Sequence, residues 1–140
     1  MGEEWWERIT IAIDSSDNFL FVISPDSMVS KYCLRELAHA LKQNKNVLPI
    51  FYRDPKGKIP AELSRLQRVD YRIDRSIKEI VAEIAEFLDE NPRWKRYHSQ
   101  ILQRAHEWKQ YSRQSALLSG EDLLEALDWL RDKGKKTRIR

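Results

Sequence analysis

The chain has 140 residues, of which 41% are hydrophobic and 34% are charged, a balance typical of a folded globular protein rather than a disordered one. No apolar run approaches the roughly 20 residues that cross a bilayer. The N-terminus also lacks the apolar core of a signal peptide, so we expect a cytoplasmic protein that does not associate with membranes.

The net charge of +3 is unevenly distributed along the chain. The last ten residues, RDKGKKTRIR, hold six basic side chains and one aspartate, so the remainder carries about −2. Because this remainder offers no basic face, we expect a solubilising basic tail at 135–140 and no nucleic-acid partner. Cys33 is the only cysteine, which excludes an internal disulfide, and the three histidines are too scattered to predict a metal site.

The first half of the chain predicts an α/β unit. Residues 3–16 have apolar side chains at helical spacing. The short apolar run at 19–23 predicts a strand covered on both faces, and turn-forming residues at 24–27 end it. A helix at 30–43 and a second apolar strand at 47–52 complete a βαβ unit with parallel strands.

The second half becomes helical. A short helix at 61–66 and a weak third strand at 67–71 precede a strongly amphipathic helix at 76–88. Residues 92–134 carry no strand signal and predict a helical hairpin. The fold class is therefore α/β, a small parallel sheet of about three strands with flanking helices. We divide the chain into a domain at 1–91, a helical extension at 92–134 and the tail.

Three short sequences in the βαβ unit stand out: Ser24-Pro25 after the first strand, SKYCLREL at 30–37 and VLPIFY at 47–52. Together they resemble the second half of a TIR (Toll/interleukin-1 receptor) domain, of the bacterial kind that precedes repeat or NTPase modules. The resemblance covers residues 3–90 and implies a flavodoxin-like fold. It also implies that the N-terminal strand–helix–strand and the BB loop of the family are missing.

The resemblance implies a site as well. In TIR domains that cleave NAD, the glutamate of a Ser-x-x-Cys-x-x-Glu pattern is essential, and that position here is Glu36. A carboxylate beside the ribose can stabilise the positive charge that develops as nicotinamide leaves. Ser24, Ser27 and Cys33 are expected to line the NAD pocket, because open α/β sheets bind ligands beyond the carboxyl ends of their strands.

Each of these residues also has a structural alternative. Glu36 could be a solvated helix carboxylate paired with Arg35 or Lys42. The two serines could form the turn and cap the helix. Cys33 could be a small buried apolar residue rather than a nucleophile, since positions 33, 36 and 39 drift by about 60° per step and do not share one tight helix face.

Two functions therefore remain open, beside a third alternative, a structural fragment with no activity of its own. The first is a signalling module that self-associates or binds other TIR domains in bacterial defence. The second is a NAD glycohydrolase that uses Glu36, with the site completed by another subunit or a missing upstream segment. NAD would then be a substrate, and no cofactor is expected. Because the missing strands would leave the first strand uncovered, we expect either self-association or re-covering by the C-terminal helices.

Overall fold

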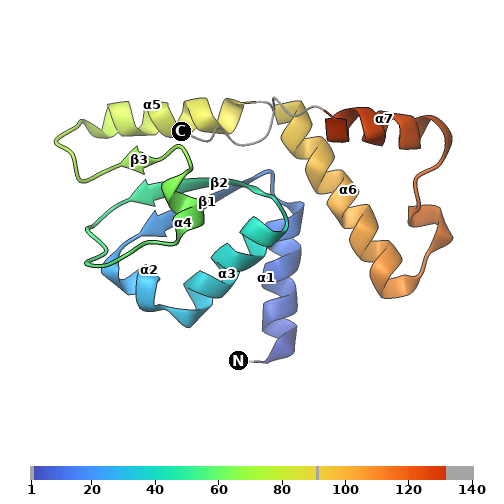
Figure 1. The fold of residues 1–140 in the computed structure, drawn as a ribbon, viewed down its shortest axis with the longest axis horizontal. Helices are drawn as coiled ribbons and strands as arrows, with labels where there is room; N and C mark the ends of the chain where they lie inside the picture. Colours follow the sequence, from blue (N-terminus) through green and yellow to red (C-terminus); the bar gives the residue numbers. More distant parts are fainter. Residues whose placement is uncertain (1, 91, 132–140) are drawn as a thin grey trace.

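A computed structural model describes residues 2–90 and 92–131, so the predicted tail at 135–140 and the end of the predicted extension at 132–134 lie outside the described residues. The chain folds into a three-stranded parallel sheet with helices on both faces, followed by a helical extension to one side (Figure 1). This arrangement confirms the predicted α/β class. Along the chain the elements are α1 (Glu3–Ser15), β1 (Asn18–Ile23), α2 (Pro25–Val29), α3 (Lys31–Lys42), β2 (Asn46–Phe51), α4 (Ala61–Ser64), β3 (Val69–Asp70), α5 (Ile77–Asp89), α6 (Pro92–Tyr111), the 3-10 turn η1 (Gln114–Ala116) and α7 (Gly120–Arg131).

The sheet has the strand order β1-β2-β3, with β2 in the centre. β1 pairs with β2 in parallel over its whole length, from Asn18 opposite Asn46 to Ile23 opposite Phe51. β3 pairs only with the last two residues of β2. This short pairing explains how Pro49 is tolerated in a central strand, because the ladder on the β3 side does not reach it.

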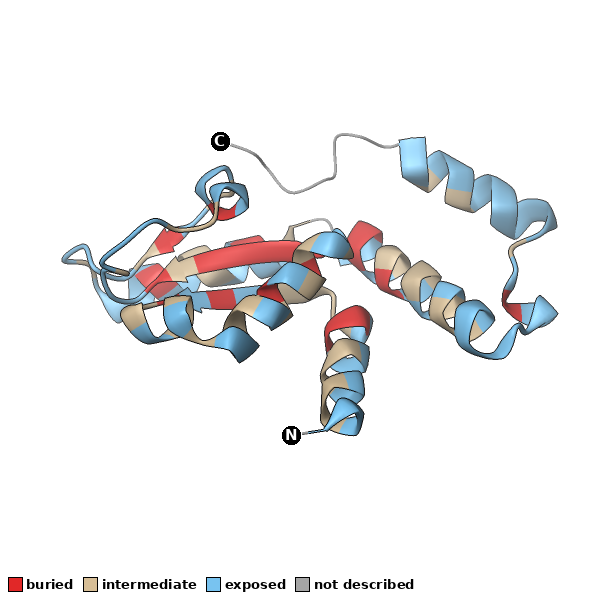
Figure 2. Cartoon of the chain, turned by 60° about the horizontal axis from the view of Figure 1, so that its bottom comes forward, coloured by how far each residue is buried: buried red, intermediate tan, exposed pale blue. Residues whose placement is uncertain are grey.

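Two hydrophobic clusters cover the two faces of the sheet. α1 and α3 pack below it in Figure 1, and α5 lies above it. The residues on the α1 and α3 side are Ile13, Phe21, Ile23, Leu37, Ala40, Val47, Phe51 and Leu63. The residues on the α5 side are Leu48, Val69, Ile80 and Phe87. Both clusters are centred on β2 and its neighbours, which is why the strands are the most buried part of the chain (Figure 2).

The outer strand β1 is covered on one face only, so the prediction that both of its faces are covered is wrong. Phe21 and Ile23 point into the core, whereas Leu20 and Val22 remain 41% and 48% exposed on the opposite face. No described residue pairs with the free edge of β1. The expected re-covering of this strand by the C-terminal helices is therefore wrong, because α6 packs against α1 instead.

Two local features, a short helix and a buried polar corner, differ from what the local sequence suggests. Residues 25–29 form the short helix α2, where a turn was expected, because Pro25 at the first helical position and a serine cap favour a helix start. The corner after α3 consists of polar residues, which normally face water, yet Lys45 and Asn46 are buried. The stem of a lysine can lie in apolar surroundings as long as its ammonium group finds acceptors.

Those acceptors belong to a buried polar junction between α1, α3 and α6. The Asp14 carboxylate, 4% exposed, accepts from Nε2 of His39 on α3 at 2.7 Å and from Nε2 of His106 on α6. Lys45 Nζ donates to the carbonyl oxygens of Asp14 at 2.6 Å and Ser16 at 2.9 Å, and to Ser99 Oγ of α6 at 3.0 Å. Burial lowers the pKa of the Lys45 ammonium, and the nearby Asp14 carboxylate opposes that shift.

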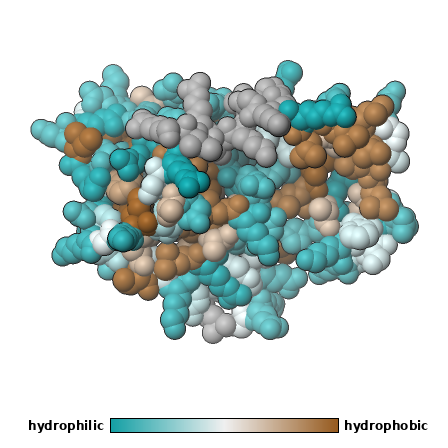
Figure 3. Space-filling view, viewed as in Figure 1, coloured by the Kyte–Doolittle hydropathy of each residue, from teal (hydrophilic) through white to brown (hydrophobic). Residues whose placement is uncertain are grey.

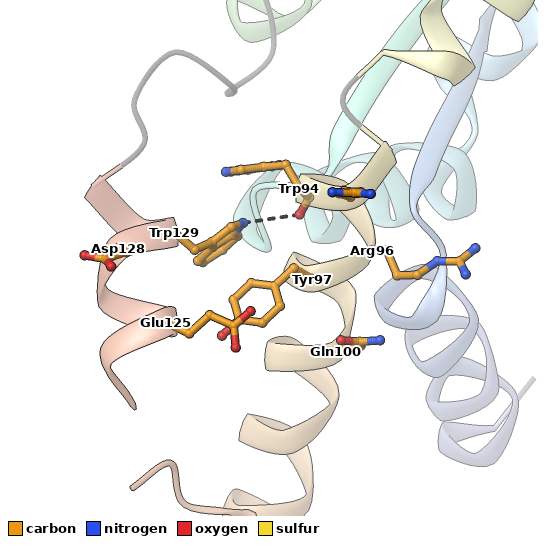
Figure 4. Close-up of a pocket in the computed structure, with 8 residues that line it drawn as sticks. Trp94, Arg96, Tyr97, Gln100, Glu125, Asp128 and Trp129 are labelled. Atoms are coloured by element: carbon orange, nitrogen blue, oxygen red, sulfur yellow. Dashed lines mark hydrogen bonds between the residues drawn. The ribbon is translucent and has the colours of Figure 1, made fainter. Parts of the chain in front are cut away.

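α7 is the least buried helix of the extension. It has no buried residue, and four of its leucines are 39–63% exposed: Leu123, Leu124, Leu127 and Leu130. These apolar side chains gather on the right side of the molecule in Figure 3. One aromatic residue, Trp129, connects α7 to α6: its ring stacks on Trp94 at 5.0 Å and its Nε1 donates to the Trp94 carbonyl oxygen at 3.2 Å (Figure 4).

Replacing Trp129 with alanine is expected to release α7 from α6, because the substitution removes both the ring stack and the hydrogen bond. The loss is expected to be about 2 kcal/mol, below the range for fully buried tryptophans since Trp129 is only half-buried. Amide hydrogen exchange across residues 120–131 measures it. Leu124→Ala on the same helix is the control, since Leu124 is 63% exposed and its truncation should leave the exchange unchanged.

Candidate functional site

A hollow of about 530 Å³ lies between the N-terminal half of α3 and the free edge of β1. It contains every residue for which the sequence predicted a site role: Glu36, Ser24, Ser27 and Cys33. The complete lining consists of Phe19, Leu20, Phe21, Val22, Ser24, Asp26, Ser27, Ser30, Cys33 and Glu36. The hollow therefore has an apolar wall along β1 and a polar wall along α2 and α3.

The serines of the polar wall are held in place by helix caps. Ser24 and Ser27 form a reciprocal capping box at the start of α2: each side-chain oxygen accepts from the backbone N–H of the other, at 3.0 and 3.2 Å. Ser30 caps α3 in the same way, by accepting from the N–H of Cys33 at 3.3 Å. The structural role expected for Ser24 and Ser27 is thus present, and it fixes their position at the rim of the hollow.

Glu36 lies one helical turn after Cys33 and is partly exposed. In the described part of the chain its carboxylate has no hydrogen bond or ion pair, so it is not held by Arg35 or Lys42. Arg35 is engaged elsewhere, since its guanidinium lies 3.8 Å from the ring centre of Trp6. Glu36 is consequently a carboxylate that faces the hollow and is available to a ligand.

Asp26 is a second carboxylate in the lining, and the sequence analysis did not single it out. It lies in the first turn of α2, where an acidic side chain is favoured by the helix dipole. The Pro25-Asp26 pair was interpreted as part of a turn. The signal for the short helix is Ser24, Pro25 and the second serine, and it places Asp26 in a first helical turn at the end of β1.

Cys33 and His39 also lie on α3, but their side chains have different surroundings. Cys33 is half-buried, packs against the core below the sheet and presents a free thiol to the hollow. His39 is bonded to Asp14 and does not line the hollow. Cys33 and Glu36 therefore share the hollow and His39 does not, so the described residues show no contact between Cys33 and His39.

Two other hollows contain none of the predicted residues. One, of about 520 Å³, lies between α6 and α7 and is lined by rings, carboxylates and guanidinium groups; Tyr97, Trp129 and Glu125 lie side by side in it (Figure 4). The other, of about 190 Å³, lies between α1 and α6 beside Asp14 and His106. Within residues 2–90 and 92–131, no group of three or more histidine, cysteine or acidic side chains is arranged to hold a metal ion. Across the same residues, no helix has both the length and the apolar character of a bilayer span.

The fold and this hollow define a class of protein: a parallel α/β domain with a carboxylate on α3, the longer of the two helices between its first two strands. The comparison with family models agrees, because the model of the TIR domain matches residues 1–88. The chain belongs to the TIR domain family. The match ends at the end of α5, so the helices α6 and α7 lie outside it.

One curated relative illustrates the chemistry found among similar proteins. It is a probable 2′ cyclic ADP-D-ribose synthase, BdTIR, of Brachypodium distachyon, and it is 41% identical over 51 residues. The aligned part covers 36% of this chain but only 23% of the relative. The similarity is therefore confined to a segment of that protein. No solved structure matches the chain.

Proposed function

We propose that this chain is a TIR signalling module that associates with itself or with other TIR domains. The observation that carries this proposal is the free edge and uncovered face of β1, where Leu20 and Val22 remain exposed. An unpaired strand edge with apolar neighbours is a template for pairing with another chain. The bacterial defence setting belongs to the same proposal and is supported by the sequence resemblance. The cytoplasmic location is also part of it and is supported by the sequence, in which no long apolar run was found.

Lysine substitution at this edge tests the proposal. The double variant Leu20→Lys and Val22→Lys places two like charges on the exposed face, and edge lysines oppose strand pairing. Sedimentation equilibrium of the unchanged chain is expected to show a mass that rises with concentration. The double variant is expected to remain a monomer over the same range. Circular dichroism checks that it is folded.

The matched control is Ile77→Lys, which changes a 66% exposed apolar residue on α5, away from β1. It is expected to associate like the unchanged chain. If the unchanged chain is a monomer at every concentration, self-association is contradicted. Binding to other TIR domains would then be tested next. Equal association of the double variant and the control would show that β1 is not the contact.

A second function is supported by Glu36 and by the relative named above. We propose that the hollow can take NAD and cleave the bond between ribose C1′ and the nicotinamide nitrogen. The electron pair of this bond would leave with nicotinamide, the Glu36 carboxylate would stabilise the cationic ribosyl group, and water or a ribose hydroxyl would then bond to C1′ and release a proton. The product would be ADP-ribose or a cyclic form.

Release of nicotinamide from NAD by the concentrated chain tests this second function. The hollow is open to solvent along β1, so we propose that another subunit or an additional segment completes it. Activity should therefore rise more steeply than in proportion to protein concentration. Turnover that is strictly proportional to concentration would contradict completion by a second subunit.

A further inference from the structure

We infer that Asp14 is a positioning residue, which ties the helix of the candidate site, α3, to the helical extension through α6. Docking of α6 would thereby set where Glu36 and Cys33 lie at the hollow. The inference rests on the proposed function only for the importance of Glu36. The coupling itself is a property of the fold and can be measured without NAD.

The geometry of the carboxylate carries the first step. Asp14 Oδ1 accepts from His39 on α3, and Oδ2 accepts from His106 on α6, 92 residues further along the chain than Asp14. A carboxylate only accepts hydrogen bonds, so both imidazoles must carry a proton on Nε2. Each carboxylate oxygen thus binds a different helix. If α3 and α6 moved apart, the Asp14 carboxylate would lose its hydrogen bond to one of them.

Burial of Asp14 raises the free energy needed to break its hydrogen bonds to His39 and His106. The Asp14 side chain is 4% exposed and the His39 side chain 14%. The His106 side chain is 43% exposed and lies on the solvent side of the junction. If α6 withdrew, Oδ2 would lose its hydrogen-bond donor, while Oδ1 would still face His39. A buried acceptor without a donor carries the full cost of its desolvation, so the carboxylate is expected to turn towards solvent and draw away from His39.

A second link runs parallel to the first. Lys45 follows α3 directly and donates to Ser99 Oγ on α6, while its other bonds go to carbonyl oxygens at the end of α1. Ser99 Oγ also lies 2.9 Å from the carbonyl oxygen of Ser16. The contact between the domain and α6 therefore contains directional hydrogen bonds, and these fix position more narrowly than apolar packing does.

The junction lies one turn from the site along a continuous helix. His39 is three residues after Glu36 and six after Cys33, all within α3. Leu37 and Ala40 of the same helix are buried in the core, so α3 is expected to shift as a unit. A substitution at His106 should consequently change the accessibility of Cys33 at the hollow, although His106 does not line the hollow.

Cys33 provides the test, because it is the only cysteine and it lines the hollow. We would measure the rate at which an aromatic disulfide reagent labels its thiol in the full chain. His106→Leu, which keeps bulk but removes the donor, is expected to raise this rate at least threefold. His106→Gln is expected to restore it to near the original rate, because the glutamine amide can donate from the same position.

Lys109→Leu is the matched control, since Lys109 is an exposed residue one turn further along α6. It should label like the unchanged chain. Equal rates for His106→Leu and the unchanged chain would overturn the inference, and so would a faster rate that glutamine does not reverse, because packing rather than the hydrogen bond would then be responsible. If His106→Leu fails to fold, Ser99→Ala tests the parallel link, and an unchanged labelling rate in that variant overturns the inference. A chain without NAD turnover would leave these results unaffected.

Discussion

Replacing the buried Asp14 with alanine is expected to lower the free energy of unfolding by about 3 kcal/mol, because it leaves buried partners without their acceptor. The substitution removes the acceptor of both imidazoles and the charge closest to Lys45, whose ammonium stays buried among carbonyl oxygens. For a chain of this length the midpoint of thermal unfolding should fall by about 10 °C. Urea denaturation followed by circular dichroism measures the loss.

Two further variants decide what the loss means. Glu4→Ala breaks only the exposed ion pair with Arg8 on the same helix, and exposed pairs contribute little, so its stability should equal that of the unchanged chain. Asp14→Asn keeps one acceptor oxygen but turns an N–H donor towards an imidazole N–H, so an intermediate loss is expected. If Asp14→Ala were no less stable than Glu4→Ala, the polar junction would not hold the extension to the domain.

This junction also marks the limit of what the sequence could predict. Asp14, His39 and His106 each occupy a helix position at which a polar side chain normally faces water, and the sequence analysis treated the histidines as scattered. Their meeting depends on how α6 crosses α1, which no local pattern specifies. Lys45 illustrates the same limit, because a lysine in a polar corner is buried only when distant carbonyl oxygens surround it.

The sheet and its helices were predictable because their signals are local. The apolar runs at 19–23 and 47–52 predicted two strands, and the stripe at 76–88 predicted a helix with one apolar face; all three elements are present. Only the second strand is covered on both faces, because no helix of the described chain covers Leu20 and Val22. The candidate site followed from the resemblance, which located Glu36, Cys33 and both serines on adjoining elements. Asp26 was missed since a five-residue helix leaves almost no periodic signal.

The extension shows an intermediate case. The helical spacing of its apolar residues predicted a hairpin of two helices, and α6 and α7 are present. The same spacing gives α7 an apolar face, yet its four leucines are 39–63% exposed and α7 is connected to α6 through Trp129. Periodicity identifies which side of a helix is apolar, but it does not say whether the chain itself covers that side.

If the chain cleaves NAD, Glu36→Gln is expected to reduce kcat roughly 10³-fold while KM changes little, a loss in line with removal of a strong electrostatic stabiliser. Glutamine matches glutamate in size and can still hydrogen-bond to ribose, so ground-state binding should persist. The negative charge matters most when the ribose becomes cationic, and an interaction made mainly in the transition state lowers kcat and kcat/KM together. Steady-state release of nicotinamide measures both constants.

Asp26→Asn is the matched control for that prediction, because Asp26 lines the same hollow and loses the same charge. Asp26 is exposed and lies on α2, so its charge is screened by water and its removal should reduce kcat less than tenfold. An equal fall in both variants would assign the effect to the summed negative charge of the hollow rather than to a placed carboxylate. Full activity of Glu36→Gln would remove Glu36 from the chemistry, and the free edge of β1 would then be the feature that gives this chain its role.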